Sequence, residues 1–195
     1  KDLGLKIITF ATGIGEFVSK EESIEIIGNH GKTTTTSIVA WCLKKCGEDA
    51  SFFIGEAPMG FEDSIHSGES KWSVQEGDEH PSLGQEPGGK FLYHKVKHIL
   101  FTSADWDHKN IYPTEESYYQ VYRELFDILP KEGKITASLD GIRVLDVLET
   151  SKLNDVVLYT TSNFNEIGYS PSVDQVEDRL AKKVDEIKAK FPEVF

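Results

Sequence analysis

The sequence contains few cysteines and no long hydrophobic segment. No apolar run approaches the roughly 20 residues that span a bilayer, and no signal-peptide pattern opens the chain, so we expect a cytoplasmic protein without a membrane partner. The two cysteines, Cys42 and Cys46, lie four residues apart on one predicted helix face. A disulfide within one helical turn is geometrically poor, and a metal would need further soft ligands nearby. We therefore expect both thiols to be buried and reduced.

Basic residues are also scarce, with 21 Lys and Arg against 33 Asp and Glu, which gives a formal net charge of −12. A nucleic-acid-binding surface needs clustered Lys and Arg, so this balance argues against nucleic acid as a partner. It does not argue against a nucleotide, because a nucleotide interacts with a local site and not with the summed charge. The length of 195 residues fits one α/β domain, or one domain plus a fragment.

The most informative feature that the sequence does contain is the segment 26–36, Ile-Ile-Gly-Asn-His-Gly-Lys-Thr-Thr-Thr-Thr. An apolar β-branched run leads into it and predicts a buried strand, and helical spacing follows from Lys32 to about residue 46. Between strand and helix, Gly28 and Gly31 bound a turn whose backbone N–H groups can converge on a phosphate at the positive helix N-terminus. Lys32 would then reach the β/γ-phosphates of ATP, and the hydroxyl of Thr33 would ligate Mg²⁺.

The general phosphate-loop pattern has a glycine where this chain has Ile26, so the short form is less specific on its own. The alternative interpretation is a glycine turn followed by a threonine-rich helix start. The strand–turn–helix order favours phosphate binding. The predicted cofactor-binding residues are Gly28, Asn29, His30, Gly31, Lys32, Thr33 and Thr34.

Alternating strands and helices along the chain predict an α/β fold with a mostly parallel, doubly wound sheet. The expected strands are 6–10, 24–27, 51–54, 71–75, 96–101, 134–137 and 156–159. The expected helices are 32–46, 114–129 with a capping-box start, 142–148 and 173–190, and 81–89 is expected to be a loop. In such a sheet, ligands gather at the carboxyl ends of the strands.

Two polar segments follow predicted strands at that edge. One is the acidic run 76–79, Glu-Gly-Asp-Glu, and the other is the pair Asp107-His108. Mg²⁺ prefers oxygen ligands, so one or two carboxylates opposite a phosphate loop would suit it. The alternatives are a solvated acidic turn for the first segment, and a capping Asp with a surface His for the second.

Taken together, the motifs at 28–36, 76–79 and 105–108 resemble the central ATPase domain of the Mur ligases. These are ATP-dependent enzymes that join amino acids or peptides to UDP-N-acetylmuramate during cell-wall assembly. The resemblance covers about residues 20–140. The His within the phosphate loop, the Thr run and the segment 90–94 (Lys-Phe-Leu-Tyr-His) are most similar to the murein peptide ligase branch, which reattaches a recycled tripeptide. The alanine-adding branch is the close alternative.

The resemblance implies roles for individual residues. Lys32 resembles the phosphate-binding lysine, and Thr33 resembles the Mg²⁺-ligating hydroxyl. Glu76 resembles the carboxylate that holds a metal between ATP and the acyl group, and His108 resembles the histidine that helps to ligate that second metal. The implied catalytic residues are thus Lys32, Glu76 and His108, the implied metal ligands are Thr33, Glu76 and His108, and the implied reaction proceeds through an acyl-phosphate.

The chain departs from the family pattern at three places. His80-Pro81 stands where the family usually has Tyr-Asp, the order Tyr93-His94 is swapped, and Ser103 replaces a frequent Asn. These departures bear on muramyl-peptide specificity more than on ATP binding. The other hypotheses are a folylpolyglutamate-type ligase, an unrelated phosphate-loop kinase, and a nucleotide-binding module that is inactive alone.

The only methionine is Met59, so Lys1 is not a natural translation start, and we expect a piece of a longer protein. Three segments are expected within it. Residues 1–23 would be a linker or the end of an N-terminal domain, 24–160 the ATP-binding central domain, and 161–195 a C-terminal helical extension. UDP-N-acetylmuramate and the peptide or amino acid would be bound with the help of the missing domains.

Overall fold

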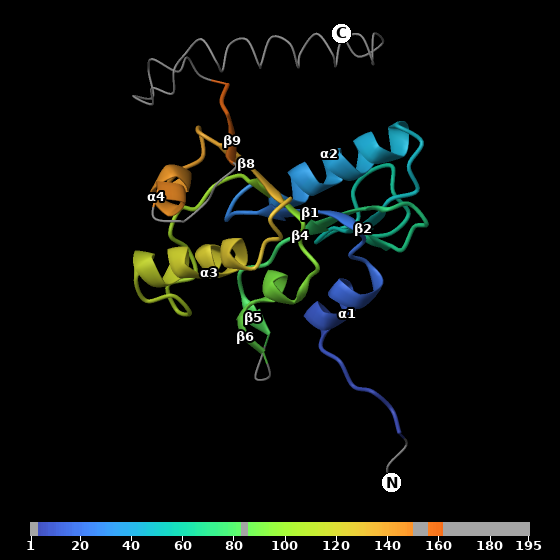
Figure 1. Ribbon diagram of the computed structural model, residues 1–195, viewed down its shortest axis with the longest axis horizontal. Coiled ribbons are helices and arrows are strands. Elements are labelled where there is room, and N and C mark those ends of the chain that lie inside the picture. Colours follow the sequence, from blue (N-terminus) through green and yellow to red (C-terminus); the bar gives the residue numbers. More distant parts are fainter. Residues whose placement is uncertain (1–3, 83–85, 150–155, 162–195) are drawn as a thin grey trace. The chain divides into compact units, whose positions relative to one another are not determined.

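A seven-stranded sheet forms the centre of the structure, in the order β3-β2-β4-β1-β7-β8-β9 (Figure 1). The structure is a computed structural model, and it describes residues 4–82, 86–149 and 156–161. All paired neighbours in the sheet run parallel except β2 and β3. The strands are β1 (Glu22–Ile27), β2 (Ser51–Phe53), β3 (Ile65–His66), β4 (Trp72–Glu76), β7 (His98–Phe101), β8 (Lys134–Ser138) and β9 (Val156–Tyr159). The predicted α/β fold with a mostly parallel sheet is confirmed.

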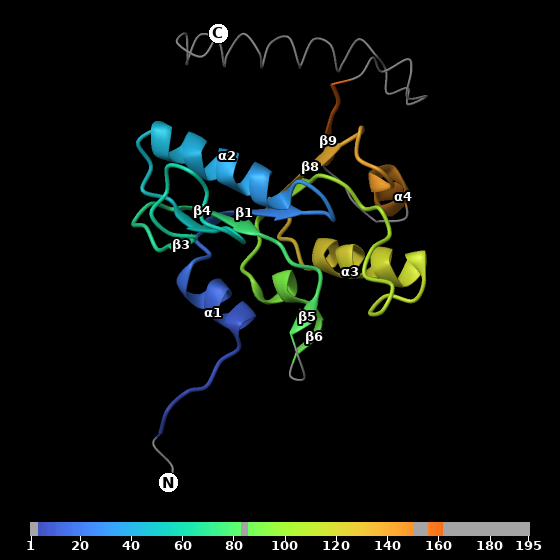
Figure 2. The ribbon, with the colours of Figure 1, turned by 180° about the vertical axis from the view of Figure 1, so that it is seen from behind.

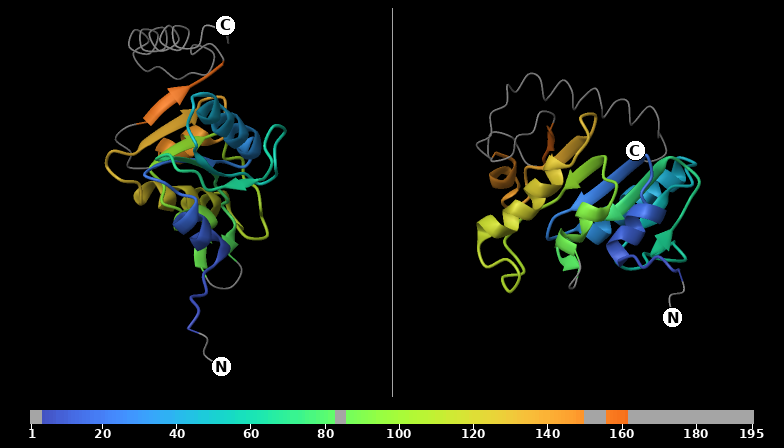
Figure 3. Two further views of the ribbon diagram at one scale, coloured as in Figure 1. Left: turned by 90° about the vertical axis from the view of Figure 1, so that its right-hand side faces the viewer. Right: turned by 60° about the horizontal axis from the view of Figure 1, so that its bottom comes forward.

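Helices cover both faces of this sheet. They are α1 (Phe10–Phe17), α2 (Lys32–Lys45), the 3₁₀ helix η1 (Lys90–Tyr93), α3 (Glu115–Asp127) and α4 (Val144–Glu149). Figure 2 shows α2 on one face and α1 and α3 on the other, and the left view of Figure 3 shows the same separation from the side. The short strands β5 (Pro81–Ser82) and β6 (Glu86–Gly89) pair with each other beside η1.

Two hydrophobic cores lie on the two sides of the sheet, and β1 contributes to both. Ile26 packs in one core with Ala40 of α2 and Val74 of β4, whereas Ile27 packs in the other with residues of β7 and α3. This is the alternation that a strand imposes on successive side chains. Both isoleucines are fully buried, so β1 and the loop that follows it are held from both faces.

The threonine-rich start of α2 is helical, and two hydroxyl groups in it bond back to the preceding turn. The hydroxyl of Thr36 donates to the carbonyl oxygen of Lys32 at 2.8 Å, and the hydroxyl of Ser37 donates to the carbonyl oxygen of Thr33 at 2.6 Å. Such bonds satisfy the hydroxyl groups within the helix but do not themselves stabilise it. The predicted helix from Lys32 is confirmed.

Two predicted elements differ from the structure. Residues 6–9 form no strand, and α1 begins at Phe10, because the side chain of Thr9 caps the helix by accepting a hydrogen bond from the Thr12 amide at 3.1 Å. The segment 81–89 contains strands β5 and β6, where a loop was predicted. The antiparallel edge strand β3 was not predicted, because two residues are too short to show a period.

The two cysteines are exposed, so the prediction of buried thiols is wrong. The buried face of α2 carries Thr36 and Ala40. Cys42 follows Ala40 by two residues, which turns it by roughly 200° around the helix axis, away from the sheet.

Part of the sequence-based prediction cannot be compared with the structure. The predicted helix 173–190 lies outside the described residues, as does the predicted extension from residue 162 onward, and the predicted boundaries of the three segments stay predictions. Through Tyr159, the described residues form one compact unit. None of the helices in the part of the chain that the structure describes has the length and apolar character of a membrane span.

Candidate phosphate-binding site

The loop between β1 and α2 passes tightly over the end of β7. Gly28 has a φ of 127°, and a Cβ atom there would overlap the hydroxyl of Thr102 and the backbone of Ser103. Gly31 has a φ of 77°, in the left-handed region, with open space around it. The first glycine is thus required by close approach and conformation together, and the second by conformation alone.

Ser103 anchors the middle of this loop. Its hydroxyl accepts a hydrogen bond from the His30 amide at 3.0 Å and donates to Oδ1 of Asn29 at 2.7 Å, while its carbonyl oxygen accepts from the Asn29 amide at 3.2 Å. The hydroxyl of Thr102 donates to the His30 carbonyl oxygen at 2.7 Å. In the sequence, Ser103 stood out only as a departure from the family pattern. In the structure its hydrogen bonds to Asn29 and His30 hold the loop in place.

Lys32 folds back over the loop from the first turn of α2. Its Nζ atom donates to the Gly28 carbonyl oxygen at 2.6 Å and to Oε2 of Glu79 at 3.1 Å. The helix begins at Gly31 as N-cap, with no side-chain capping bond. The positive end of α2, its uncapped first turn and the ammonium group of Lys32 therefore lie together at the loop, as an anion site requires.

Thr33 and Glu76 are in direct contact beside the loop. The hydroxyl of Thr33 donates to Oε1 of Glu76 at 2.9 Å, and Oε2 of Glu76 accepts from the Gly55 amide at 2.7 Å. Glu76 reaches this place because β4 pairs parallel with β1, with Glu76 opposite Ile26 in register. The structure thus brings together two of the three predicted metal ligands, and both offer the oxygen atoms that Mg²⁺ prefers.

His108, the third predicted metal ligand, lies with a different carboxylate. Its Nε2 atom is 3.3 Å from Oε1 of Glu79 and 3.8 Å from Oδ2 of Asp107. Its backbone is in the left-handed region, with a φ of 54°, which is uncommon for a residue other than glycine. Within the described residues, no hydrogen bond or ion pair joins His108 to Glu76.

Glu79 is the central residue that sequence reasoning did not assign a role. Its side chain is only 1% exposed, and besides Lys32 and His108 it accepts a hydrogen bond from the Tyr118 hydroxyl at 3.3 Å. The Tyr112 hydroxyl donates to its carbonyl oxygen. Burial and then the charge of Glu79 raise the pKa of Tyr112 to about 12, and they raise the pKa of Tyr118 as well, so both phenols stay neutral donors. The acidic run 76–79 was the available signal, but it does not show which carboxylate is buried.

The fold and this site define a class of protein. A buried parallel strand, a glycine turn and a helix N-terminus with a returning lysine are the parts of a phosphate-loop nucleotide-binding domain. The family model of the Mur ligase middle domain matches residues 26–192, and the chain belongs to the Mur ligase family.

Curated relatives agree with this assignment. The chain is 31% identical over 121 residues to the UDP-N-acetylmuramate--L-alanyl-gamma-D-glutamyl-meso-2,6-diaminoheptandioate ligase of Escherichia coli, covering 62% of this chain and 26% of the relative. It is 30% identical over 166 residues to the UDP-N-acetylmuramate--L-alanine ligase of Paenarthrobacter aurescens, covering 84% of this chain and 35% of the relative. The chain thus spans about a quarter to a third of the length of these relatives.

Solved structures show the same fold. The UDP-N-acetylmuramate:L-alanyl-gamma-D-glutamyl-meso-diaminopimelate ligase from Neisseria meningitides has a TM-score of 0.71 and 25% identity, covering 80% of this chain and 52% of that one. The MurF ligase from Thermotoga maritima, solved in complex with ADP, has a TM-score of 0.51 and 14% identity, covering 78% of this chain and 35% of that one. The resemblance read from the sequence motifs is confirmed at the level of the family.

Proposed function

We propose that this chain is the ATP-binding middle domain of a ligase that joins a peptide or amino acid to UDP-N-acetylmuramate in cell-wall synthesis or recycling. The observation that carries the proposal is the phosphate loop itself, in which Lys32 returns to the Gly28 carbonyl oxygen while Thr33 meets Glu76. The names of the relatives support the substrate class, since both curated proteins described above are UDP-N-acetylmuramate ligases. We propose that the protein acts in the cytoplasm.

The residues present fit ATP and Mg²⁺. Backbone can approach a phosphate at Gly31, where no atom fills the space that a Cβ would take, and no side chain caps the first turn of α2. Residues 28–34 would hold the phosphates, and the hydroxyl of Thr33 would hold Mg²⁺. When bound, the ion would neutralise part of the negative charge on the phosphates.

The contribution of the chain to catalysis would be positioning and electrostatic stabilisation. Lys32 would exchange its present acceptors, the Gly28 carbonyl and Glu79, for phosphate oxygens, and its charge would stabilise the transferring phosphoryl group. Glu76 and His108 are proposed to share a second divalent cation near the substrate carboxylate. In the structure Glu76 bonds to Thr33 and Gly55, so this arrangement requires it to exchange a partner.

The branch of the family also belongs to the proposal. The peptide-adding branch is favoured by the motifs of the loop and of residues 90–94, and the alanine-adding branch is the second candidate, which the 84% coverage by the P. aurescens ligase supports. The two candidates differ only in the incoming amine, so a single assay separates them.

The test is a ligation assay with the full-length protein that contains this chain. ATP, Mg²⁺ and UDP-N-acetylmuramate are supplied with either alanine or the murein tripeptide, and the product is measured by mass spectrometry. We expect ligation with the tripeptide, its loss in Glu76→Gln, and its retention in Glu62→Gln, which removes an equal charge from an exposed loop. Product formed with alanine but not with the tripeptide would assign the chain to the alanine-adding branch. Absence of product with both amines would contradict the ligase proposal.

A further inference from the structure

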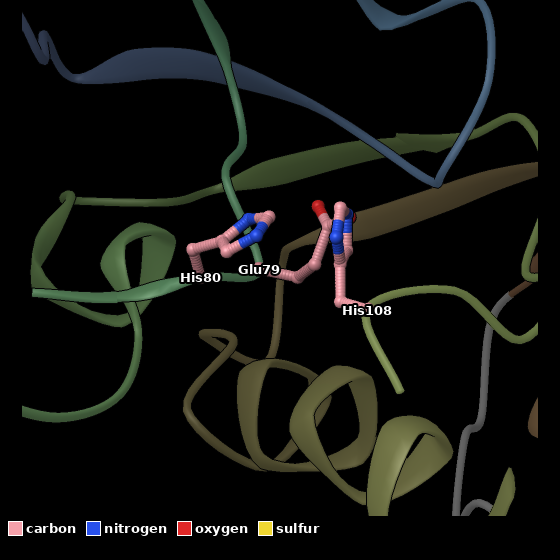
Figure 4. Close-up of side chains that lie close together, drawn as sticks. All are labelled: Glu79, His80 and His108. Atoms are coloured by element: carbon pink, nitrogen blue, oxygen red, sulfur yellow. The ribbon is translucent and has the colours of Figure 1, made fainter. Parts of the chain in front are cut away.

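Three side chains from two separate segments converge beside the phosphate loop. The possible ligand atoms of Glu79, His80 and His108 all lie within 4.8 Å of one another. The two imidazole rings are in contact, with centroids 3.8 Å apart and planes inclined by 61°, and Figure 4 shows both rings with the Glu79 side chain. A carboxylate and two imidazoles are the donor set of many open transition-metal sites.

The orientation of His80 is fixed in the way that metal-ligating histidines are fixed. Oδ1 of Asp78 lies 3.0 Å from Nδ1 of His80 and also accepts from the His80 amide at 2.9 Å. Lys90 donates to the other carboxylate oxygen of Asp78 at 2.6 Å. A carboxylate on one imidazole nitrogen orients the ring and raises the basicity of the other nitrogen.

The other two proposed ligands, Glu79 and His108, are also held in place by neighbouring groups. Oε1 of Glu79 faces His108 while Oε2 holds Lys32, so the two oxygens of this carboxylate have separate neighbours. The carbonyl oxygen of His108 accepts from the amides of Ile111 and Tyr112 at 2.8 and 2.9 Å, which fixes its left-handed turn. The two histidine side chains are 34% and 30% exposed, so an ion and its remaining ligands can reach the site from solvent.

We propose that Glu79, His80 and His108 bind a divalent transition metal of the zinc class, at a site separate from the oxygen ligands of Thr33 and Glu76. Imidazole nitrogen favours such metals, whereas hydroxyl and carboxylate oxygen favour Mg²⁺. The neighbourhood of the phosphate loop thus carries two donor sets of different preference. His108 belongs both to this ligand set and to the one proposed with Glu76, so it can serve only one of the two ions at a time, and we expect the zinc-class ion when nucleotide is absent. His80 distinguishes the two ligand sets, and this inference does not require the proposed ligase activity.

The test uses the 195-residue chain, freed of metal, without nucleotide and in excess Mg²⁺. Co²⁺ is titrated while its visible absorption is recorded, and Zn²⁺ is then added to displace it. We expect a Co²⁺ spectrum with nitrogen ligands in the wild type. In His80→Ala the affinity should fall by more than the roughly 10–100-fold that loss of an outer-shell partner costs. The matched control is His66→Ala, which removes another histidine paired with an aspartate, at 2.8 Å from Asp49.

Two further measurements make the ligand set itself falsifiable. Glu76→Gln should leave Co²⁺ binding unchanged, and a loss there would show that the cation uses Glu76 in place of Glu79 and His80. X-ray absorption at the zinc edge of the loaded wild type should show two imidazole ligands, whatever the stability of the variants. No Co²⁺ binding by the wild type, equal binding by His80→Ala, or fewer than two imidazoles on zinc would overturn the proposal.

Discussion

Oε2 of Glu79 lies 3.1 Å from Nζ of Lys32, and this ion pair joins residues 47 apart in the sequence. Glu79 follows β4 and Lys32 opens α2, so the pair connects the acidic segment to the phosphate loop. Both side chains are largely withdrawn from solvent, at 1% and 17% exposed. Any phosphate that uses Lys32 must therefore compete with a buried carboxylate.

Glu79→Gln should strengthen the binding of an ATP analogue when metals are removed by a chelator. The substitution keeps the shape of the side chain but removes the charge that competes for Lys32. A hydrogen bond to a charged group contributes about 1.5–3 kcal/mol, so a gain of roughly 10–150-fold in affinity is expected by calorimetry. Glu62→Gln, with the same change in net charge at an exposed position, should show no gain. Unchanged or weaker binding by Glu79→Gln would show that the ion pair does not compete with phosphate.

Gly28→Ala should destabilise the fold far more than Gly31→Ala. Both positions have positive φ, but only at Gly28 would the added methyl group overlap Thr102 and Ser103. Backbone strain and overpacking together should cost about 2–5 kcal/mol at Gly28, against about 1 kcal/mol at Gly31. Urea denaturation of the two variants measures the difference. Equal losses would contradict the close approach of the loop to β7.

The stability of the domain should depend on pH in opposite ways through two glutamates of β1. Burial raises the pKa of Glu25, against the opposing effect of His94, whereas hydrogen bonds from Lys97 and then His98 lower the pKa of Glu22. A raised pKa gives stability that is present below the ordinary value of 4.5 and is lost as the pH rises above it. A lowered pKa gives stability that is present above 4.5 and is lost as the pH falls.

The check is the free energy of unfolding as a function of pH, compared between the wild type and two variants. Glu25→Gln should remove the part of the stability that is lost on raising the pH. Glu22→Gln should remove the part that is lost on lowering it. The same direction of change in both variants would refute the assignment of opposite pKa shifts.

The chain of 195 residues alone should bind ATP weakly and give no ligation of UDP-N-acetylmuramate to alanine or to the murein tripeptide. The motifs that carry the proposal lie in a middle domain, and closure of neighbouring domains completes such sites and excludes water. At most slow ATP hydrolysis is expected. Turnover within the ~1–10³ s⁻¹ of ordinary enzymes would show that this chain already contains a complete active site.

The elements with a clear residue pattern over several positions were predictable from the sequence. An apolar β-branched run predicted β1, and the capping box of Thr114 and Ser117 predicted the start of α3, where the structure shows both reciprocal bonds at 3.1 Å. The error at residues 6–9 has a local cause, since the capping residue Thr9 was read as part of a strand. Strands of two residues, such as β3 and β5, have no period to detect.

The site was predictable where its residues form a continuous motif. Lys32 and Thr33 lie at the loop after β1, within the motif 28–36, whereas Glu76, which was predicted to share a second ion with His108, contacts Thr33 in the structure. The assignment of ions to these side chains stays a prediction. The contacts of Glu79 depend on β4, α2, the loop after β7 and α3 meeting in space. No pattern within one segment shows which of the carboxylates in 76–79 is buried, so the joining of Lys32, His108 and Tyr118 through Glu79 was visible only in the structure.

The most direct test of the central claim is the affinity of the chain for a non-hydrolysable ATP analogue with Mg²⁺, measured by calorimetry in the wild type, Lys32→Ala and Lys71→Ala. Lys32 is tied to the phosphate loop, whereas Lys71 lies over the ring of Trp72, away from that loop, and serves as the matched control. We expect binding by the wild type and by Lys71→Ala, and loss of binding in a folded Lys32→Ala. Equal affinity in all three proteins would contradict the assignment of residues 28–34 as the ATP phosphate site.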